Sequence, residues 1–149
     1  MCEDTNCLCG AFEDECGCEG FYHEMPRLGE PAPDFVAETT HGQIKLSDYK
    51  DKKWVVVFSH PADFTPVCTT EFVAFSKEYS EFEKRNVALI GLSVDSSSSH
   101  LAWVRDIEAN FGVHVPFPII ADLDMGVASL YGMIQPAMSS TAACRAVFF

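Results

Sequence analysis

Basic residues are scarce in this sequence. Its 149 residues include 10 Lys and Arg against 22 Asp and Glu, which gives a formal net charge of -12. A surface of this sign repels nucleic acid and anionic membranes, so we expect neither as a partner. The acidity is concentrated near the N-terminus, because seven acidic residues precede Arg27, the first Lys or Arg of the chain.

Long hydrophobic runs are also missing. No stretch approaches the roughly 18 apolar residues of a membrane-spanning helix, and Met1-Cys2-Glu3-Asp4 has neither the basic start nor the apolar centre of a signal peptide. We therefore expect a soluble, cytoplasmic protein. With 48% apolar residues, the chain can bury one sizeable core but is too short for two ordinary domains.

Cysteine is present but unevenly spread. Five of the seven cysteines lie within the first 18 residues, and the other two, Cys68 and Cys144, stand alone. We expect residues 1–25 to form a cysteine-rich acidic extension and residues 26–149 to form the folded domain.

The extension holds a candidate zinc site. Four of its thiolates could bind zinc tetrahedrally: Cys7, Cys9, Cys16 and Cys18. Their one-residue gaps are tighter than those of common zinc motifs, so a disordered tail, disulfides and a local redox relay all stay open as alternatives.

The middle of the chain predicts an α/β domain. Residues 54–58 form a continuous β-branched run typical of a strand buried on both faces. Apolar positions recur at helical spacing through residues 66–84, with an aromatic stripe that should face the sheet. A second buried strand follows at 87–94, and the order strand, helix, strand predicts a right-handed crossover between parallel strands.

Shorter elements flank this unit. Strands are expected at 34–38, 43–46 and 116–121, and a short helix at 125–131. The serines at 96–99 should cap a helix whose apolar positions are Leu101, Val104, Ile107 and Phe111. A last strand begins near Cys144 and breaks off at Phe149, so we expect the natural domain to continue beyond this chain.

Cys68 has the position of a reactive thiol. The predicted helix starts at about Pro66, which suits a first-turn position because its missing N–H costs little there. Cys68 then lies in the first turn, where unpaired backbone N–H groups and the helix dipole stabilise the thiolate over the thiol.

The pattern Pro61-x-x-x-Thr65-x-x-Cys68 resembles the peroxiredoxin signature. The longer string Ser59-His-Pro-Ala-Asp-Phe-Thr-Pro-Val-Cys-Thr-Thr-Glu71 is similar to the branch with one-cysteine and archaeal enzymes. Segments at 95–100, 116–122 and 145–149, together with Trp103, also resemble that branch. The resemblance extends from about residue 27 to the end, without the family's usual C-terminal portion.

The resemblance implies a thioredoxin-like fold, with a central mixed sheet flanked by helices. It also implies reduction of hydrogen peroxide or organic hydroperoxides with no cofactor for the chemical step. A thioredoxin-like protein or a small thiol would restore the oxidised cysteine, and a homodimer or higher homo-oligomer is expected.

Four positions match catalytic residues of the family. Cys68 would be the peroxidatic nucleophile, Thr65 the hydroxyl that orients peroxide, Pro61 the shield against water, and Arg145 the guanidinium beside the thiolate. These roles suit the chemistry, because the reaction depends on aiming the O–O bond at sulfur and stabilising the leaving oxyanion. The product on the protein would be Cys68 sulfenic acid.

Other residues have supporting or structural interpretations. Glu71, one turn beyond Cys68, is positioned to hold an arginine or to complement the helix dipole, and His60 could line the pocket. His100 and Trp103 share a helix face and are expected to pack. Cys144 should point to the opposite sheet face from its neighbour Arg145, as a packed thiol.

Two rival functions remain open on these grounds. A thioredoxin-like disulfide oxidoreductase would suit the layout, but Thr65-Pro-Val-Cys68 places a hydroxyl where the first thiol of C-x-x-C would stand. A truncated domain that acts as a thiol-rich redox or metal sensor through its N-terminal segment is the other rival.

Overall fold

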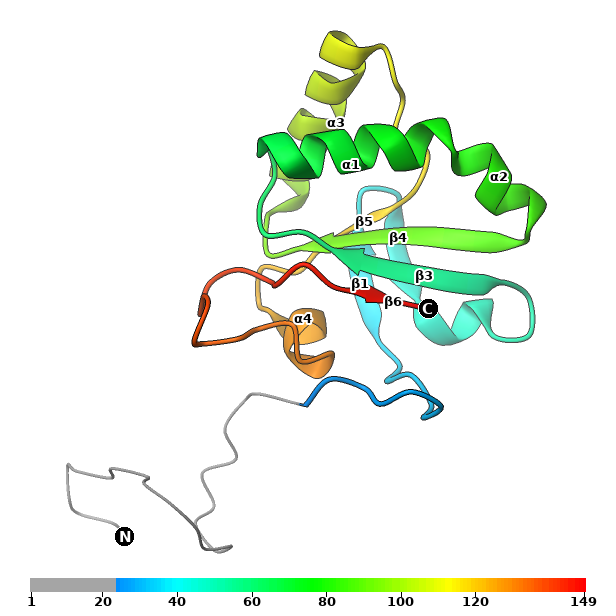
Figure 1. Cartoon of the computed structure of the whole chain (residues 1–149), viewed down its shortest axis with the longest axis vertical. Coiled ribbons are helices and arrows are strands. Elements are labelled where there is room, and N and C mark those ends of the chain that lie inside the picture. Colours follow the sequence, from blue (N-terminus) through cyan, green and yellow to red (C-terminus); the bar gives the residue numbers. More distant parts are fainter. Residues whose placement is uncertain (1–23) are drawn as a thin grey trace, which may run out of the picture.

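A six-stranded mixed sheet forms the centre of the computed structural model, which describes residues 24–149 (Figure 1). The predicted N-terminal zinc ligands lie outside these residues. The sheet order is β2-β1-β5-β4-β3-β6. The strands are β1 (Val36–Thr39), β2 (Gly42–Lys45), β3 (Trp54–Ser59), β4 (Val87–Ser93), β5 (Ile119–Ala121) and β6 (Val147–Phe148).

The two central strands are the predicted apolar runs. β3 and β4 pair in parallel, with Val56 opposite Leu89, and β5 continues the parallel part on the far side of β4. Two helices, α1 (Pro66–Lys77) and α2 (Tyr79–Lys84), connect β3 to β4. β1, β2 and β6 run antiparallel to their neighbours, so the predicted mixed sheet is confirmed.

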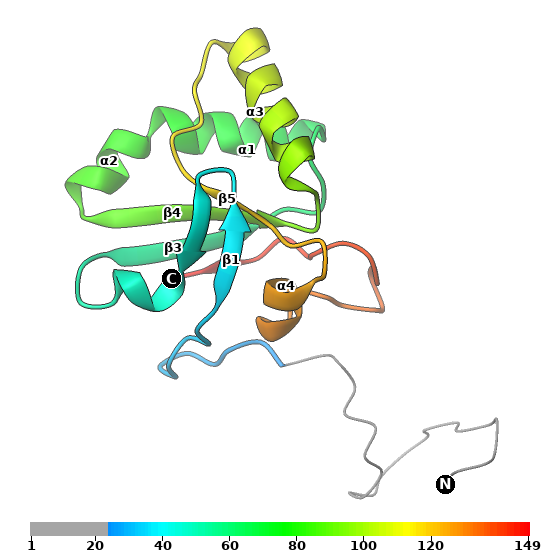
Figure 2. The ribbon, with the colours of Figure 1, turned by 180° about the vertical axis from the view of Figure 1, so that it is seen from behind.

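Each face of the sheet carries its own hydrophobic core. Helices α1, α2 and α3 (Ser97–Phe111) cover one face, and α4 (Gly126–Leu130) with the short 3-10 helix at Leu46–Tyr49 covers the other (Figures 1 and 2). Along β3, Val56 and Phe58 join the first core while Val57 joins the second. This alternation follows from the two-residue period of a strand.

The helix expected over residues 66–84 is two helices. The chain leaves helical geometry at Glu78, where φ is -89° and ψ is 2°. The expected aromatic stripe is nevertheless confirmed: Phe72 is fully buried, and Phe75, Tyr79 and Phe82 pack against the same core. Apolar periodicity thus persists through the break and does not reveal it.

Helix α3 begins where the serines predicted it. The Ser96 hydroxyl accepts a hydrogen bond from the Ser99 N–H at 3.1 Å, as an N-cap does. The predicted apolar face is wrong at both ends, because Leu101 and Phe111 are 42% and 49% exposed. Its middle is confirmed, because Ile107 is buried and Val104 packs against the same core. His100 and Trp103 are buried on this face as well, as their packing interpretation implied.

The C-terminal elements are shorter than predicted. β5 starts only at Ile119, because Pro116 and Pro118 lack the N–H that a sheet ladder requires. The last strand, β6, begins at Val147 and pairs with β3. Within residues 24–149, none of the helices has the length and apolar character needed to cross a membrane.

Candidate active site

Cys68 occupies the first turn of α1, directly above the exit of β3. Pro66 is the first helical residue, and Thr65 before it has extended backbone angles, φ -86° and ψ 146°. The Cys68 side chain is buried, with a relative exposure of 1%. A thiolate there faces the positive end of α1 in a site that is nearly closed to water, which strengthens the electrostatic attraction.

Arg145 reaches Cys68 from the C-terminal segment. Its Nη2 lies 3.4 Å from Cys68 Sγ, and its Nη1 forms an ion pair with Glu71 Oε2. The guanidinium precedes β6, whose pairing with β3 brings it to the helix terminus. Glu71 is one helical turn after Cys68, so the carboxylate aims the guanidinium at the sulfur.

The loop from β3 to α1 is held by short-range hydrogen bonds. The Thr65 hydroxyl donates to the Ala62 carbonyl at 2.9 Å, while the Thr69 hydroxyl donates to the Thr65 carbonyl at 2.8 Å. Trp103 Nε1–H donates to Thr69 Oγ1 at 3.2 Å and so ties α3 to this turn. Pro61, the expected water shield, is half-buried at the start of the loop.

His60 is part of the core beneath this loop. Its side chain is fully buried, and its ring packs against Phe72 and Trp103 with centroids 5.0 Å apart in both cases. Nε2 lies 2.9 Å from Asp63 Oδ1, whereas Nδ1 has no hydrogen-bond partner within residues 24–149. His60 therefore belongs to a buried polar cluster, and its expected place in the pocket lining stays a prediction.

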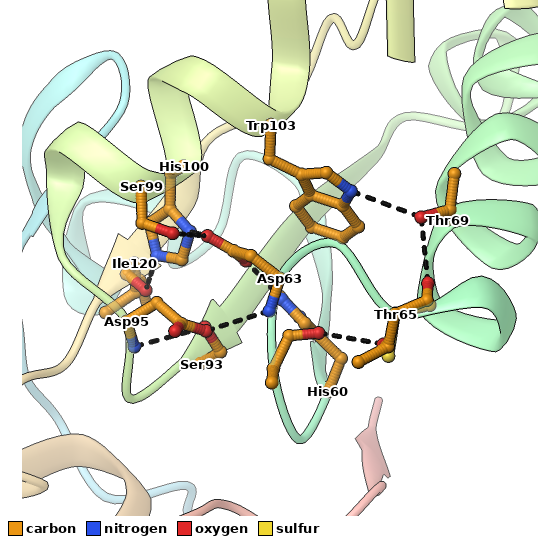
Figure 3. A network of polar contacts seen from close by, with 12 residues as sticks. His60, Asp63, Thr65, Thr69, Ser93, Asp95, Ser99, His100, Trp103 and Ile120 are labelled. Atoms are coloured by element: carbon orange, nitrogen blue, oxygen red, sulfur yellow. Dashed lines mark hydrogen bonds and ion pairs between the residues drawn. The ribbon is translucent and has the colours of Figure 1, made fainter. Parts of the chain in front are cut away.

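Asp63 is the centre of that cluster, and sequence reasoning missed it (Figure 3). Its Oδ2 accepts a hydrogen bond from the Ser99 hydroxyl at 2.7 Å and lies 2.8 Å from His100 Nδ1. Burial by itself raises the pKa of Asp63, but hydrogen bonds from His100 and His60 and the His100 charge outweigh it and hold that pKa well below its ordinary value. The signal in the sequence was an aspartate three residues after His60, inside the string around Cys68.

Cys144 lies apart from the reactive thiol. It packs against the core on the opposite face of the sheet from Cys68. Burial raises the pKa of the Cys144 thiol above its ordinary value, which outweighs a hydrogen bond that lowers it. This arrangement agrees with a packed thiol rather than an activated one.

The fold and the buried helix-terminal cysteine define a thioredoxin-like protein with a single cysteine at the position of the reactive site. The sequence matches the family model "AhpC/TSA family" over residues 28–149. The chain therefore belongs to the AhpC/TSA family.

Named relatives and solved structures give the same family. A peroxiredoxin of Aquifex aeolicus is 65% identical over 124 residues, which are 83% of this chain and 56% of that protein. Peroxiredoxin 2 of Sulfurisphaera tokodaii is 58% identical over 125 residues, covering 84% and 58%. A crystal structure of peroxiredoxin 6 from Arenicola marina matches with a TM-score of 0.75 at 41% identity, covering 83% of this chain and 59% of that one. The chain thus spans little more than half the length of these relatives.

Proposed function

We propose that this chain carries the reactive-cysteine site of a thiol peroxidase, which reduces hydrogen peroxide and organic hydroperoxides through Cys68. The observation that carries the proposal is the contact between Arg145 Nη2 and Cys68 Sγ at the N-terminus of α1. Both features favour a sulfur anion, and the thiolate is the nucleophilic form of cysteine. The names of the relatives favour this activity over a disulfide oxidoreductase or a sensor.

The chemistry follows from these groups. The Cys68 thiolate attacks one peroxide oxygen, an S–O bond forms, and the O–O bond breaks. Sulfur is oxidised to sulfenic acid, and the leaving oxygen takes a proton to become water or an alcohol. Arg145 and the first-turn N–H groups of α1 stabilise the negative charge on the leaving oxygen, and Thr65 and Pro61 orient the peroxide and exclude water.

The return to the thiol requires an external reductant. Sulfenic acid condenses with a thiol to give a disulfide and water, and a second thiol then reduces that disulfide. A similar solved protein, a yeast mitochondrial 1-Cys peroxiredoxin, has a thiol resolving mechanism that works via glutathione and thioredoxin systems. We propose a similar thiol source here, in a cytoplasmic homo-oligomer that needs no cofactor for the chemical step.

Stopped-flow measurement of peroxide consumption tests the proposal. Pre-reduced chain should consume one equivalent of hydrogen peroxide rapidly, and dimedone should then label Cys68. Cys68→Ser should abolish both signals. Cys144→Ser is the matched control and should retain them. Slow consumption at the rate of a free thiol in all three proteins would refute the proposal for this chain.

A further inference from the structure

A buried cluster of two histidines and an aspartate lies next to the proposed peroxidase site but has no step in its chemistry. His60 and Asp63 lie in the loop between β3 and α1, and His100 is in the first turns of α3 (Figure 3). All three are at least nine-tenths buried, with exposures of 0%, 8% and 0%. One ligand atom from each lies within 4.8 Å of the other two.

The hydrogen bonds show which group each ring nitrogen of this cluster faces. His100 Nε2 faces the carbonyl of Ile120 at 3.0 Å, and a carbonyl can only accept, so Nε2 carries a proton. His100 Nδ1 lies 2.8 Å from Asp63 Oδ2, and His60 Nε2 lies 2.9 Å from the other oxygen of the same carboxylate. Two ring nitrogens therefore point at one carboxylate in a place that is closed to water.

We propose that His60 Nε2, the Asp63 carboxylate and His100 Nδ1 form a binding site for a divalent transition-metal ion, of which zinc is the natural candidate. Two imidazoles and one carboxylate are a ligand set that zinc uses when a fourth position is left open. Zinc bonds of roughly 2.0–2.2 Å place tetrahedral ligand atoms about 3.4 Å apart. One ligand atom from each of the three residues already lies within 4.8 Å of the other two, so small side-chain shifts would seat the ion.

The protons balance on binding. Zinc displaces the proton that His100 Nδ1 and Asp63 Oδ2 share in their hydrogen bond, and that proton leaves the site. On His60 the proton moves from Nε2 to Nδ1, which is buried and has no hydrogen-bond partner within residues 24–149. His60 Nδ1 can take up this second proton without breaking an existing hydrogen bond.

Neighbouring groups already orient the proposed ligands through hydrogen bonds, as the outer shell of a metal site does. The Ile120 carbonyl fixes the His100 ring through its second nitrogen, which is how metal-binding histidines are usually oriented. The Ser99 hydroxyl bonds Asp63 Oδ2, and the backbone N–H of Asp63 donates to Asp95 Oδ2 at 3.0 Å. These bonds keep the carboxylate between the two rings.

Titration of the full-length protein with zinc and with cobalt tests this site. The five cysteines of residues 1–18 should be replaced by serine, so that their thiolates do not compete. We expect calorimetry to show one zinc ion per chain. Cobalt should give d–d absorption without a thiolate charge-transfer band, because all three ligands are nitrogen or oxygen.

Variants of the cluster separate this site from adventitious binding. His100→Gln and Asp63→Asn should weaken zinc binding at least about 100-fold, and Ser99→Ala, which removes only an outer-shell bond, by about 10-fold. The matched control is His114→Gln at an exposed histidine 3.9 Å from Glu108, which should bind zinc as the parent does.

A folding measurement keeps the test decisive if a variant is destabilised. Zinc should raise the thermal midpoint of the parent and of His114→Gln by mass action, and should not raise that of His100→Gln. Less than 0.1 equivalent of zinc on the parent, a thiolate band with cobalt, or unchanged affinity in both His100→Gln and Ser99→Ala would overturn the proposal. None of these readouts depends on peroxidase activity.

Discussion

Arg145 Nη2 lies 3.4 Å from Cys68 Sγ although the two residues are 77 positions apart. The contact depends on β6, which pairs antiparallel with β3 and places the segment before it over the helix terminus. It also depends on Glu71, which holds the other guanidinium nitrogen. The sheet edge and the first turn of α1 therefore act together on one sulfur atom.

Replacing Arg145 should slow peroxide reduction by the pre-reduced chain. We expect Arg145→Gln to lower the second-order rate constant about 100-fold, as the loss of one group that stabilises developing charge does. Arg145→Lys should lower it less, by about 10-fold, because an ammonium keeps the charge but does not offer the planar fork that serves Glu71 and Cys68 together. Stopped-flow measurement with hydrogen peroxide gives these rates.

The matched control is Arg85→Gln. Arg85 directly follows α2 and forms an exposed ion pair with Glu81 at 2.9 Å. Its loss should leave the rate constant unchanged, since exposed ion pairs contribute little. Equal rates for Arg145→Gln and the parent would show that the guanidinium has no part in the reaction.

Asp63→Asn should destabilise the protein and change its response to acid. The variant removes the carboxylate that bonds both histidine rings, and breaking such a buried pair costs about 3–5 kcal/mol. Because folding depresses the pKa of Asp63, the stabilisation is complete above the unfolded-state value near 4 and is lost as the pH falls below it. As the pH falls below about 4, parent stability should therefore decline more steeply than that of Asp63→Asn.

Urea unfolding at several pH values measures this difference. Asp106→Asn is the matched control, because Asp106 is exposed and its Oδ1 accepts a hydrogen bond from Asn110 Nδ2 at 2.9 Å on the same helix. Its pH dependence should follow the parent. Parallel stability curves for Asp63→Asn and the parent would contradict the ionised carboxylate.

Much of the fold could be predicted because the apolar pattern sets it. The β-branched run at Trp54–Phe58 and the run from Val87 became the two central parallel strands. The break at Glu78 could not be predicted, because the aromatic residues keep helical spacing across it. On α3 the apolar pattern missed one buried position, because residue 100 is a histidine, and it included Leu101 and Phe111, which are exposed.

The site, like the fold, has residues that the sequence predicts together and residues that it does not. Cys68 and Glu71 belong to one local string, so helix geometry alone places them together. Asp63 and His100 are 37 residues apart, and no periodicity marks a buried polar pair. Sequence reasoning placed His100 correctly in the core but gave it a packing role, because the carboxylate that gives it chemistry lies in another element.

Cys144 should react slowly with alkylating reagents while the protein is folded. Its raised pKa leaves less thiolate at a given pH than an unfolded chain has. Iodoacetamide labelling at pH 8, followed by peptide mass mapping, should modify Cys144 several-fold more slowly in buffer than in urea. Raising the pH should accelerate the folded-state reaction. Equal rates in buffer and urea would show that the thiol is neither shielded nor perturbed.

Gly91→Ala should loosen the helix that carries Cys68. A Cβ at this position of β4 would lie 3.1 Å from Phe72 Cζ and 3.5 Å from Ile119 Cγ2. The Phe72 ring cannot withdraw easily, because it packs against Trp103 at 4.6 Å between centroids and against Phe58 at 5.3 Å. We expect a loss of about 1–3 kcal/mol in unfolding free energy.

A double-mutant cycle identifies the cause. Phe72→Leu shortens the side chain that the new methyl meets, so Gly91→Ala should cost less in that background than in the parent. Gly126→Ala is the matched control, because its Cβ would approach only the exposed side chain of Asp124 at 3.4 Å or more. That variant should keep parental stability. Since Phe72 lies one turn after Cys68, Gly91→Ala should also slow peroxide reduction. The Phe72→Leu background should restore part of that rate. If the stability losses of Gly91→Ala and Phe72→Leu were additive, the strain would lie elsewhere in the sheet.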